Sequence, residues 1–577
     1  MCGYTYYFNL NSSKKLDQKR IKDTLNLQRH RGPNFSKYIN IDKNHFFHNR
    51  LKIIDLSNKA NQPMSDSRGN IILFNGEIYN YLELIKKHNL KKLKTKSDTE
   101  VILALYDKLG NSFLKELNGI FTFLIFNKKK QQLFVARDRF GVKPLFYYLD
   151  KDQIVFSTEI KPILSFVKTI KIDFQQITEY ISNGKYFHTE KTFFKNIKIF
   201  PISSFKIINL KNRKILKSGK YWALIKNKKL ICENYQQFYK KFLEKFESAL
   251  KYNFVSDVEI SLMLSSGNDS IFIHDYIKNK TSKNLNCFTY GWKDDRYDEI
   301  KRLKKIKLKI KKHHAHIVQT KKIFDNLKDT IYKFEGPVGG FGTLGQYYLF
   351  KKIREKNIKV AFSGEGADEF LLGYSIFKSI LDKNKIEEGK KFLVDKVHSP
   401  DGYELNDNDL INGYFKKGQK LKKFKNLNMV LDNYVSKIKL PKLLIFYDKA
   451  SALNGIEGRV PMLDHNLAEF LFSNSPYFRI QKKPIKDYFI KNKISFYKDK
   501  LNVSTPQREF FKTKQIVTKV LHLIKNGNLK KLKILNFKKF ESKYNNFLKE
   551  KTASNSFFIW KVINAEYFLQ VYKNQII

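Results

Sequence analysis

Cysteine is scarce in this chain of 577 residues, which has only Cys2, Cys232 and Cys287. They lie too far apart for a disulfide framework or a zinc cluster, so small disulfide-rich and zinc-binding domains are excluded. No run of about 18 apolar residues is present, which argues against a membrane span. The amino terminus lacks the basic and apolar regions of a secretory signal. These absences favour a protein of the reducing cytoplasm.

Acidic residues are also few, because 55 Asp and Glu stand against 110 Lys and Arg, for a formal net charge of +55. One interpretation is binding to nucleic acid or another anionic surface. However, only 14 of the basic residues are Arg, the side chain whose fork reads phosphate and guanine. Lys, Asn, Ile, Phe and Tyr, which A/T-rich codons favour, are plentiful. We therefore interpret the charge as a surface trait from coding bias, and expect no nucleic-acid partner.

Two regions with different secondary-structure patterns follow one another along the chain. In residues 1–222, short β-type runs are separated by turn residues and interrupted by two helical stretches. The expected strands are Tyr4–Leu10, Ile71–Phe74, Gly119–Phe126, Gln132–Ala136, Ile154–Ser157 and Ser204–Leu210. The expected helices are Tyr81–His88 and Asp98–Leu109, and Ser97 and Asp98 are capping candidates for the second.

From residue 235 onward, amphipathic helices alternate with single apolar strands, which is typical of a parallel α/β sheet. The clearest examples are a helix at Tyr235–Tyr252 and strands at Glu259–Leu264, Leu285–Tyr290 and Ile358–Phe362. Residues 223–234 are the best linker candidate, which gives expected domains at 1–222 and 235–577. Beyond about Lys390 the chain is expected to be mostly helical and very Lys-rich.

A nucleophile is indicated at the second residue. Removal of Met1 would leave Cys2 with a free α-amino group, whose ordinary pKa of about 7.7–8.0 suits a general base for its own thiol. An amide-hydrolysing thiol also needs an oxyanion hole, which Asn75 and Gly76 could supply, although Asn-Gly after a strand is also an ordinary hairpin turn. Three charged residues, Arg50, Glu77 and Asp98, are candidates for gripping the carboxylate and the ammonium of a free amino acid.

A nucleotide site is indicated after the strand Glu259–Leu264. Leu264, Ser265, Ser266, Gly267, Asn268, Asp269 and Ser270 form a turn of small residues that leads into a helix. Such a turn can cradle an oxyanion with its backbone N–H groups, hydroxyls and helix dipole. It has no Lys and so is not a Walker A loop. Asp269 would repel phosphate unless a cation lay between them, which points to Mg²⁺.

Motifs in order along the chain carry a family resemblance. They are Met1-Cys2-Gly3, Arg29–Pro33, His48–Leu51, Phe74–Asn80, Ser97–Glu100, Ala136–Leu145, Ser265–Ser270, Ser363–Glu369 and Asp448–Asp464. Together they resemble glutamine-hydrolysing asparagine synthetases, in which a class II glutaminase domain is fused to an ATP-pyrophosphatase domain. The resemblance covers residues 1 to roughly 510. It implies an N-terminal-nucleophile αββα sandwich, followed by a doubly wound parallel sheet with a helical extension.

The resemblance also implies roles for individual residues. In the first domain Cys2 would be the nucleophile, Asn75 and Gly76 the oxyanion hole, and Arg50, Glu77 and Asp98 glutamine ligands. In the second, the Leu264–Ser270 loop, Tyr290, Ser363 and Gly364 would bind ATP, and Asp269 and Asp368 would hold Mg²⁺. Glu365 would assist formation of an acyl-adenylate and Lys449 would stabilise the departing pyrophosphate. We expect Glu457, Arg459 and Asp464 to form a structural ion-pair network.

The acceptor is the open point of this interpretation. The family implies amidation of aspartate to asparagine, with glutamate, AMP and pyrophosphate as the other products. Here Gly340 stands where an Asp is usual, and Thr505–Glu509 resembles a branch that is expected to amidate sugar acids. The acceptor is therefore aspartate or another carboxylate such as a uronic acid.

A homodimer is possible, and a nucleic-acid-binding protein on an inactive scaffold is the alternative from another class. His313, His314 and His316 are interpreted as solvated rather than metal-binding.

Overall fold

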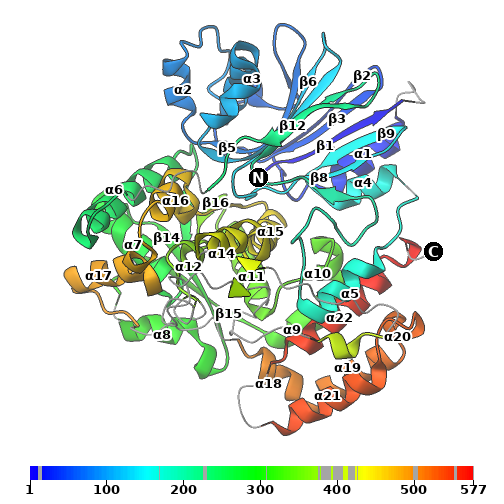
Figure 1. Ribbon diagram of the computed structural model, residues 1–577, viewed down its shortest axis with the longest axis vertical. Coiled ribbons are helices and arrows are strands. Elements are labelled where there is room, and N and C mark those ends of the chain that lie inside the picture. Colours follow the sequence, from blue (N-terminus) through cyan, green and yellow to red (C-terminus); the bar gives the residue numbers. More distant parts are fainter. Residues whose placement is uncertain are drawn as a thin grey trace.

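The computed structural model describes residues 1–10, 16–167, 169–224, 231–281, 283–306, 308–374, 377, 392–393, 407–412, 423–424, 427–497, 505–550 and 555–575. Figure 1 shows a β-rich part at the top and an α/β part below it, with the amino terminus between them. The predicted linker at 223–234 lies partly outside the described residues. No helix in these ranges is long and apolar enough to cross a membrane.

The β-rich part contains two antiparallel six-stranded sheets. The first has the order β10 (Lys198–Ile199), β8 (Phe146–Leu149), β9 (Gln153–Ser157), β1 (Gly3–Asn9), β3 (Asn44–Arg50) and β2 (Phe35–Ile41). The second has the order β12 (Ile215–Lys220), β11 (Ser204–Asn209), β7 (Gln132–Arg137), β6 (Gly119–Asn127), β5 (Ile71–Ile78) and β4 (Met64–Ser65).

Alternating side chains of these strands make two separate cores. Tyr4, Tyr6 and Phe8 of β1 join residues such as Leu124 and Phe126 of β6 in an apolar layer between the sheets. Tyr7 points the other way and stacks on Phe166 of α4 (Ile160–Phe166), with ring centroids 4.1 Å apart. Helix α1 (Gln18–Asn26) also contacts the first sheet, and α3 (Asp98–Leu109), beside α2 (Tyr81–Lys87), contacts the second. The predicted αββα sandwich is therefore confirmed.

The α/β part is built on a five-stranded parallel sheet. Its strand order is β15 (Lys312–Val318), β14 (Asn286–Trp292), β13 (Ile260–Met263), β16 (Val360–Phe362) and β19 (Glu457–Arg459). Helices α7 (Asn268–Thr281), α8 (Glu299–Ile306), α11 (Phe341–Glu355) and α15 (Leu440–Ala452) contact these strands, and α6 (Tyr235–Asn253) packs on α16 (His465–Phe472). Strand order runs outward in both directions from β13, as in a doubly wound sheet, so a switch point lies between β13 and β16.

The helical extension is closely packed rather than an appended tail. It comprises α17 (Lys483–Lys491), α18 (Gln507–Lys512), α19 (Lys514–Lys525), α20 (Asn528–Lys531), α21 (Phe537–Lys549) and α22 (Phe557–Val571). Helix α22 is largely buried against α10 (Leu327–Phe334) and against α5 (Phe174–Asn183) of the β-rich part. The end of the chain therefore helps to join the two parts.

Several elements differ from the sequence-based expectation. Strands β2 and β3 were not expected, because Lys, Asn and His interrupt their apolar pattern. The hairpin turn that Asn75-Gly76 offered as an alternative to an oxyanion hole is not formed, since β5 continues to Ile78 and pairs with β6 along its whole length. The histidines interpreted as solvated lie within β15, where His313 and His314 bond to polar side chains of β14.

Candidate functional site

Cys2 lies buried immediately before β1, in contact with β5. Its backbone nitrogen donates a hydrogen bond to Asn75 Oδ1 at 2.8 Å, and its Sγ is 4.0 Å from the carbonyl oxygen of Leu51. Burial raises the pKa of the Cys2 thiol above its ordinary value. A thiol in this environment needs a nearby base before it can act as a nucleophile.

Asn75 and Gly76 present donors beside that thiol. Because Asn75 Oδ1 is used by Cys2, its Nδ2 is the free end of the amide, and it has no hydrogen-bond partner among the described residues. Gly76 has a φ of +145°, and a Cβ there would lie 2.0 Å from the carbonyl oxygen of Ile120. Only glycine fits this close approach between two strands. The arrangement is consistent with an oxyanion hole built on a sheet rather than on a turn.

Arg50 is the last residue of β3, and its guanidinium donates hydrogen bonds to uncharged oxygen atoms. Nη1 donates to the carbonyl oxygen of Ser57 at 2.7 Å and to Asn61 Oδ1 at 2.9 Å, and Nη2 donates to the carbonyl oxygen of Ile54 at 3.2 Å. No ion pair of Arg50 is present in the described part of the chain. The guanidinium is therefore oriented but keeps an unneutralised charge, as a carboxylate-binding site requires.

Glu77 and Asp98 are buried acids on the same side of the sandwich. Asp98 is the first residue of α3 and accepts the Ile78 backbone N–H at 2.9 Å. Burial, reinforced by Glu457, raises the pKa of Asp98 to about 7. Burial also raises the pKa of Glu77, and Glu457 and Asp98 add to the effect. An ammonium group placed here would offset this mutual repulsion.

Met1 fills a buried space next to Cys2. Its ammonium nitrogen is 3.9 Å from Glu457 Oε2, and its sulfur accepts a contact from Arg31 Nη2 at 3.7 Å. Burial lowers the pKa of this amine to about 6. While Met1 is present the nitrogen of Cys2 is an amide, so the base function predicted for it requires removal of Met1.

The loop after β13 folds as a compact anion cradle. Ser270 Oγ accepts the Ser265 N–H at 3.0 Å, and the Gly267 N–H bonds to Ser265 Oγ at 3.1 Å. The Ser266 N–H and hydroxyl both donate to Glu299 Oε2, at 2.7 and 2.5 Å. A carboxylate thus occupies donors that the sequence predicts for phosphate. Asn268 begins α7 and donates to the carbonyl oxygen of Tyr497 at 3.1 Å.

The loop after β16 lies directly beside this cradle. A Cβ on Gly364 would lie 2.8 Å from the Cβ of Asp269, so the two loops are in close contact. Glu365 is bonded through Oε1 to Gln346 Nε2 of α11 at 3.0 Å, and burial raises its pKa. The predicted residues from Leu264 to Ser270 and from Ser363 to Asp368 therefore gather at the switch point. The hydroxyl of Tyr290 in β14 is 3.4 Å from the carbonyl oxygen of Gly342. Burial, together with the nearby charges of Glu299 and Glu365, raises the pKa of Tyr290, so this side chain also lies near the loops.

Lys482 joins the two expected metal ligands. Its Nζ lies 2.6 Å from Asp269 Oδ2 and 2.7 Å from Asp368 Oδ1. Burial opposes the charge, but the two carboxylates raise the pKa of Lys482. No sequence motif indicates Lys482, because Lys is abundant and 213 positions separate Lys482 from Asp269.

The positions of the Asp269 and Asp368 carboxylates suit a shared divalent cation. Asp269 and Asp368 converge on a single cationic centre, and Mg²⁺ is commonly held by one or two carboxylates together with substrate phosphates. No group of three or more His, Cys, Asp or Glu side chains that could hold a metal alone is present in the described ranges. The protein would therefore bind Mg²⁺ together with a nucleotide rather than in a cage of its own.

The structure places Lys449 in a different setting from the one its predicted role requires. Its Nζ lies 2.5 Å from Glu159 Oε2 and 2.5 Å from Glu335 Oε2, and all three side chains are buried. The ion pairs of Lys449 are with Glu159 and Glu335, which lie outside the two loops. Lys482 pairs with one acid of each loop, so among the described residues it is the lysine that contacts both loops. The expected network of Glu457 and Arg459 is present, with Arg459 Nε 2.7 Å from Glu457 Oε1, whereas Asp464 instead bonds to Asn118 at 3.0 Å.

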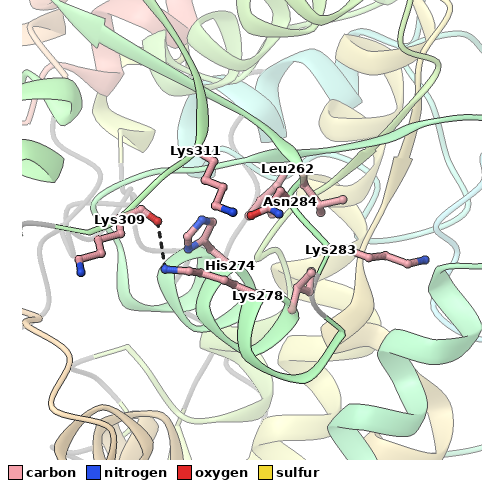
Figure 2. Close-up of a pocket in the computed structure, with 9 residues that line it drawn as sticks. Leu262, His274, Lys278, Lys283, Asn284, Lys309 and Lys311 are labelled. Carbon is pink, nitrogen blue, oxygen red and sulfur yellow. Dashed lines mark hydrogen bonds between the residues drawn. The ribbon is translucent and has the colours of Figure 1, made fainter.

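A small cavity at the amino ends of the parallel strands is not part of this site, which lies at their carboxyl ends. Figure 2 shows His274 of α7 and the lysines Lys278 and Lys311 around it. It lies by segments that lead into β14 and β15, at the amino ends of the strands, and its volume is about 10 Å³. That volume admits about one water molecule, so the cavity is too small for a nucleotide or an acceptor.

Comparisons with known proteins agree with this two-part arrangement. Residues 1–222 match the family described as glutamine amidotransferase domain, and residues 241–570 match the family described as asparagine synthase. A putative glutamine-hydrolysing asparagine synthetase 2 of Methanocaldococcus jannaschii is 33% identical over 432 residues, which are 68% of this chain and 79% of that protein.

Two further relatives have different printed activities. The glutamine-hydrolysing asparagine synthetase 1 of Bacillus subtilis is 30% identical over 397 residues, 67% of this chain and 61% of that protein. The amidase chry2 of Gibberella zeae is 26% identical over 410 residues, 66% of this chain and 60% of that protein. The matched part of the chain thus spans about three fifths of the length of each. The chain belongs to the asparagine synthase family and carries an amino-terminal glutamine amidotransferase domain.

Proposed function

We propose that this protein is a glutamine-hydrolysing asparagine synthase that uses ATP to convert a carboxylate, aspartate in the first instance, into an amide. The observation that carries this proposal is the presence of two complementary sites in one chain. One surrounds Cys2 with amide donors and with groups for an amino acid. The other brings the loops after β13 and β16 together at the switch point.

The first stage would release ammonia from glutamine. After removal of Met1, the α-amino group of Cys2 takes the proton of its thiol, and Sγ attacks the side-chain amide carbon. Asn75 Nδ2 and the Gly76 N–H stabilise the oxyanion, while Arg50 holds the α-carboxylate and Glu77 and Asp98 hold the ammonium. Collapse of the tetrahedral intermediate expels ammonia, and water then hydrolyses the thioester to give glutamate.

The second stage would activate the acceptor. A carboxylate oxygen of the acceptor attacks the α-phosphorus of ATP and pyrophosphate leaves, giving an acyl-adenylate. The Ser265–Ser270 loop and Lys482 bind the pyrophosphate, and Glu365 lies where it could orient the reacting groups. Asp269 and Asp368 would hold Mg²⁺, which supplies charge neutralisation for the phosphates when bound. Ammonia then attacks the acyl carbon and AMP leaves with the original carboxylate oxygen.

Residues 335–343, which we call the acceptor segment, contain Gly340 and give one reason to test a second substrate class. Gly340 precedes α11 at a position where a Cβ would lie 2.8 Å from Gln507 Oε1 and 3.1 Å from Phe557 Cζ. An acidic side chain at residue 340, which could pair with the ammonium of aspartate, would have to displace the side chains of Gln507 and Phe557. This favours, as the alternative, an acceptor that lacks an α-ammonium group, such as a uronic acid.

An acceptor screen tests the proposal. Glutamine-dependent AMP formation would be measured with aspartate and with a panel of uronic acids at equal concentrations. Aspartate-dependent AMP and asparagine formation supports the synthase, and activity confined to uronic acids supports the alternative. If no carboxylate elicits AMP formation although glutamine is hydrolysed, the proposed reaction is wrong.

A further inference from the structure

A chain of buried charged side chains runs between the two sites. It begins at Cys2, whose carbonyl oxygen accepts a hydrogen bond from Arg31 Nε at 3.1 Å. Arg31 Nη1 lies 2.8 Å from Glu159 Oε1, and Glu159 Oε2 lies 2.5 Å from Lys449 Nζ. Each of these side chains is at most 2% exposed. The backbone of the nucleophile is thus connected to a lysine of α15 through Arg31 and Glu159.

The same lysine holds the start of the acceptor segment. Glu335 Oε2 lies 2.5 Å from Lys449 Nζ, and its two carboxylate oxygens accept the N–H groups of Ile160 and Lys161 at 2.8 and 2.7 Å. Those N–H groups begin α4, so a residue of the α/β part caps a helix of the sandwich. Glu335 also has a φ of +59°. Such a conformation in a residue other than glycine persists only when its surroundings fix it.

The segment that follows Glu335 is held by hydrogen bonds and leads into α11, which contacts the loop after β16. The Val338 N–H donates to Asn564 Oδ1 at 2.8 Å, and the Phe341 N–H donates to Gln507 Oε1 at 3.1 Å. Helix α11 then starts, and its Gln346 bonds to Glu365 at 3.0 Å. With these anchors, a displacement of Glu335 would be passed on to the position of Glu365.

We propose that Lys449, held between Glu159 and Glu335, is a positioning residue that couples glutamine hydrolysis at Cys2 to acceptor activation at Glu365. Two buried carboxylates share one ammonium, and Glu335 has no other ion pair in the described part of the chain, so separating Lys449 from Glu335 would leave a buried charge without a counter-charge. The three side chains therefore keep their contacts or rearrange together. This inference rests on the proposed function, since it requires both half-reactions.

The test is the ratio of glutamate released to AMP formed, with ATP, glutamine and acceptor saturating. The wild-type ratio should be near one. Lys449→Met should raise it roughly fivefold or more, the lower end of typical coupling between sites, while AMP formation with ammonium chloride stays within about twofold of wild type. Lys449→Arg, which keeps the charge, should restore much of the coupling. Lys333→Met is the matched control, because Lys333 forms a partly exposed pair with Asp329 on α10.

A second variant separates coupling from folding. Glu335→Gln should also raise the ratio, and the double variant with Lys449→Met should raise it no further than the larger single effect, because both changes break one link. An unchanged ratio in a variant that keeps ammonia-dependent AMP formation would overturn the proposal. So would an equal loss of both activities, which indicates a purely structural role. If Lys449→Met does not fold, Glu335→Gln and Lys449→Arg decide. A wild-type protein without AMP formation would instead refute the proposed function.

Discussion

The proposed glutamine site around Cys2 and the proposed nucleotide site differ in how their charged and polar groups are paired. In the pocket, Arg50 is held by carbonyl oxygens and an amide oxygen, and Asn75 Nδ2 has no hydrogen-bond partner in the described part of the chain. In the nucleotide site, Glu299 occupies the donors of Ser266, and Lys482 lies between Asp269 and Asp368. The first site thus keeps donors that no protein acid neutralises, whereas in the second a carboxylate and a lysine occupy positions predicted for a phosphate and a cation.

This difference predicts different responses to substrate. Glutamine can enter the pocket and supply the missing counter-charges, so its binding should depend on the protonation of the pocket acids. ATP must displace Glu299 from Ser266, and Mg²⁺ must share its carboxylates with Lys482. Nucleotide binding should therefore involve an exchange of ion partners and a local rearrangement.

The largest expected effect isolates the first site. Cys2→Ala should lower glutamine-dependent glutamate release by roughly a thousandfold or more, since removal of a catalytic nucleophile has effects of this size or larger. AMP formation with ammonium chloride should remain, because the second site keeps all its groups. Parallel assays of glutamate and AMP on one preparation provide the measurement. Equal loss of both activities would mean that the sites are not separate.

The next largest effect concerns the cation of the second site. Lys482→Met should lower acceptor-dependent AMP formation roughly a hundredfold, a typical cost of removing one electrostatic contact to a reacting group. Glutaminase activity should not change. Lys483→Met is the matched control, because the neighbouring Lys483 pairs with Asp487 at 2.8 Å and is partly exposed. Wild-type AMP formation in the Lys482 variant would contradict the assignment of this residue to the nucleotide site.

A smaller effect follows from the pKa of Asp98, which is raised to about 7. Below that pH the free enzyme carries a proton on Asp98 that must leave before the acid can pair with an ammonium. The value of kcat/KM for glutamine should then fall as pH falls, with a logarithmic slope that includes one proton for Asp98 beside those for Glu77 and the Cys2 amine. Asp98→Asn should reduce the slope by about one. An unchanged slope would show that Asp98 does not face the substrate ammonium.

The smallest expected effect tests the internal substitute for phosphate. Glu299→Gln removes a negative charge from the donors of Ser266, so KM for ATP should fall by roughly threefold, as expected for a modest electrostatic competitor. Steady-state AMP formation at varied ATP would measure it. A higher KM would indicate that Glu299 shapes the loop rather than competing with the nucleotide.

The fold was largely predictable because its signals are local. The apolar alternation of β6 and β7 and the small-residue loop after β13 can be read within a few residues. The interruption of β3 by polar residues hid that strand, and the continuation of β5 through Asn75-Gly76 depends on its pairing with β6. Lys482, the proposed cation of the nucleotide site, was missed for a similar reason. Lys449 lies within a recognisable motif but is bound by Glu159 and Glu335, whereas Lys482 reaches Asp269 only through the tertiary fold.

In the proposed reaction, the acceptor carboxylate is activated by attachment to the α-phosphorus of ATP. The most direct measurement uses the acceptor identified by the screen, labelled with ¹⁸O in its carboxylate, with glutamine and ATP. The proposed reaction predicts AMP that carries one labelled oxygen, formed in step with the amide. Label in inorganic phosphate with ADP as the product, or unlabelled AMP, would contradict it.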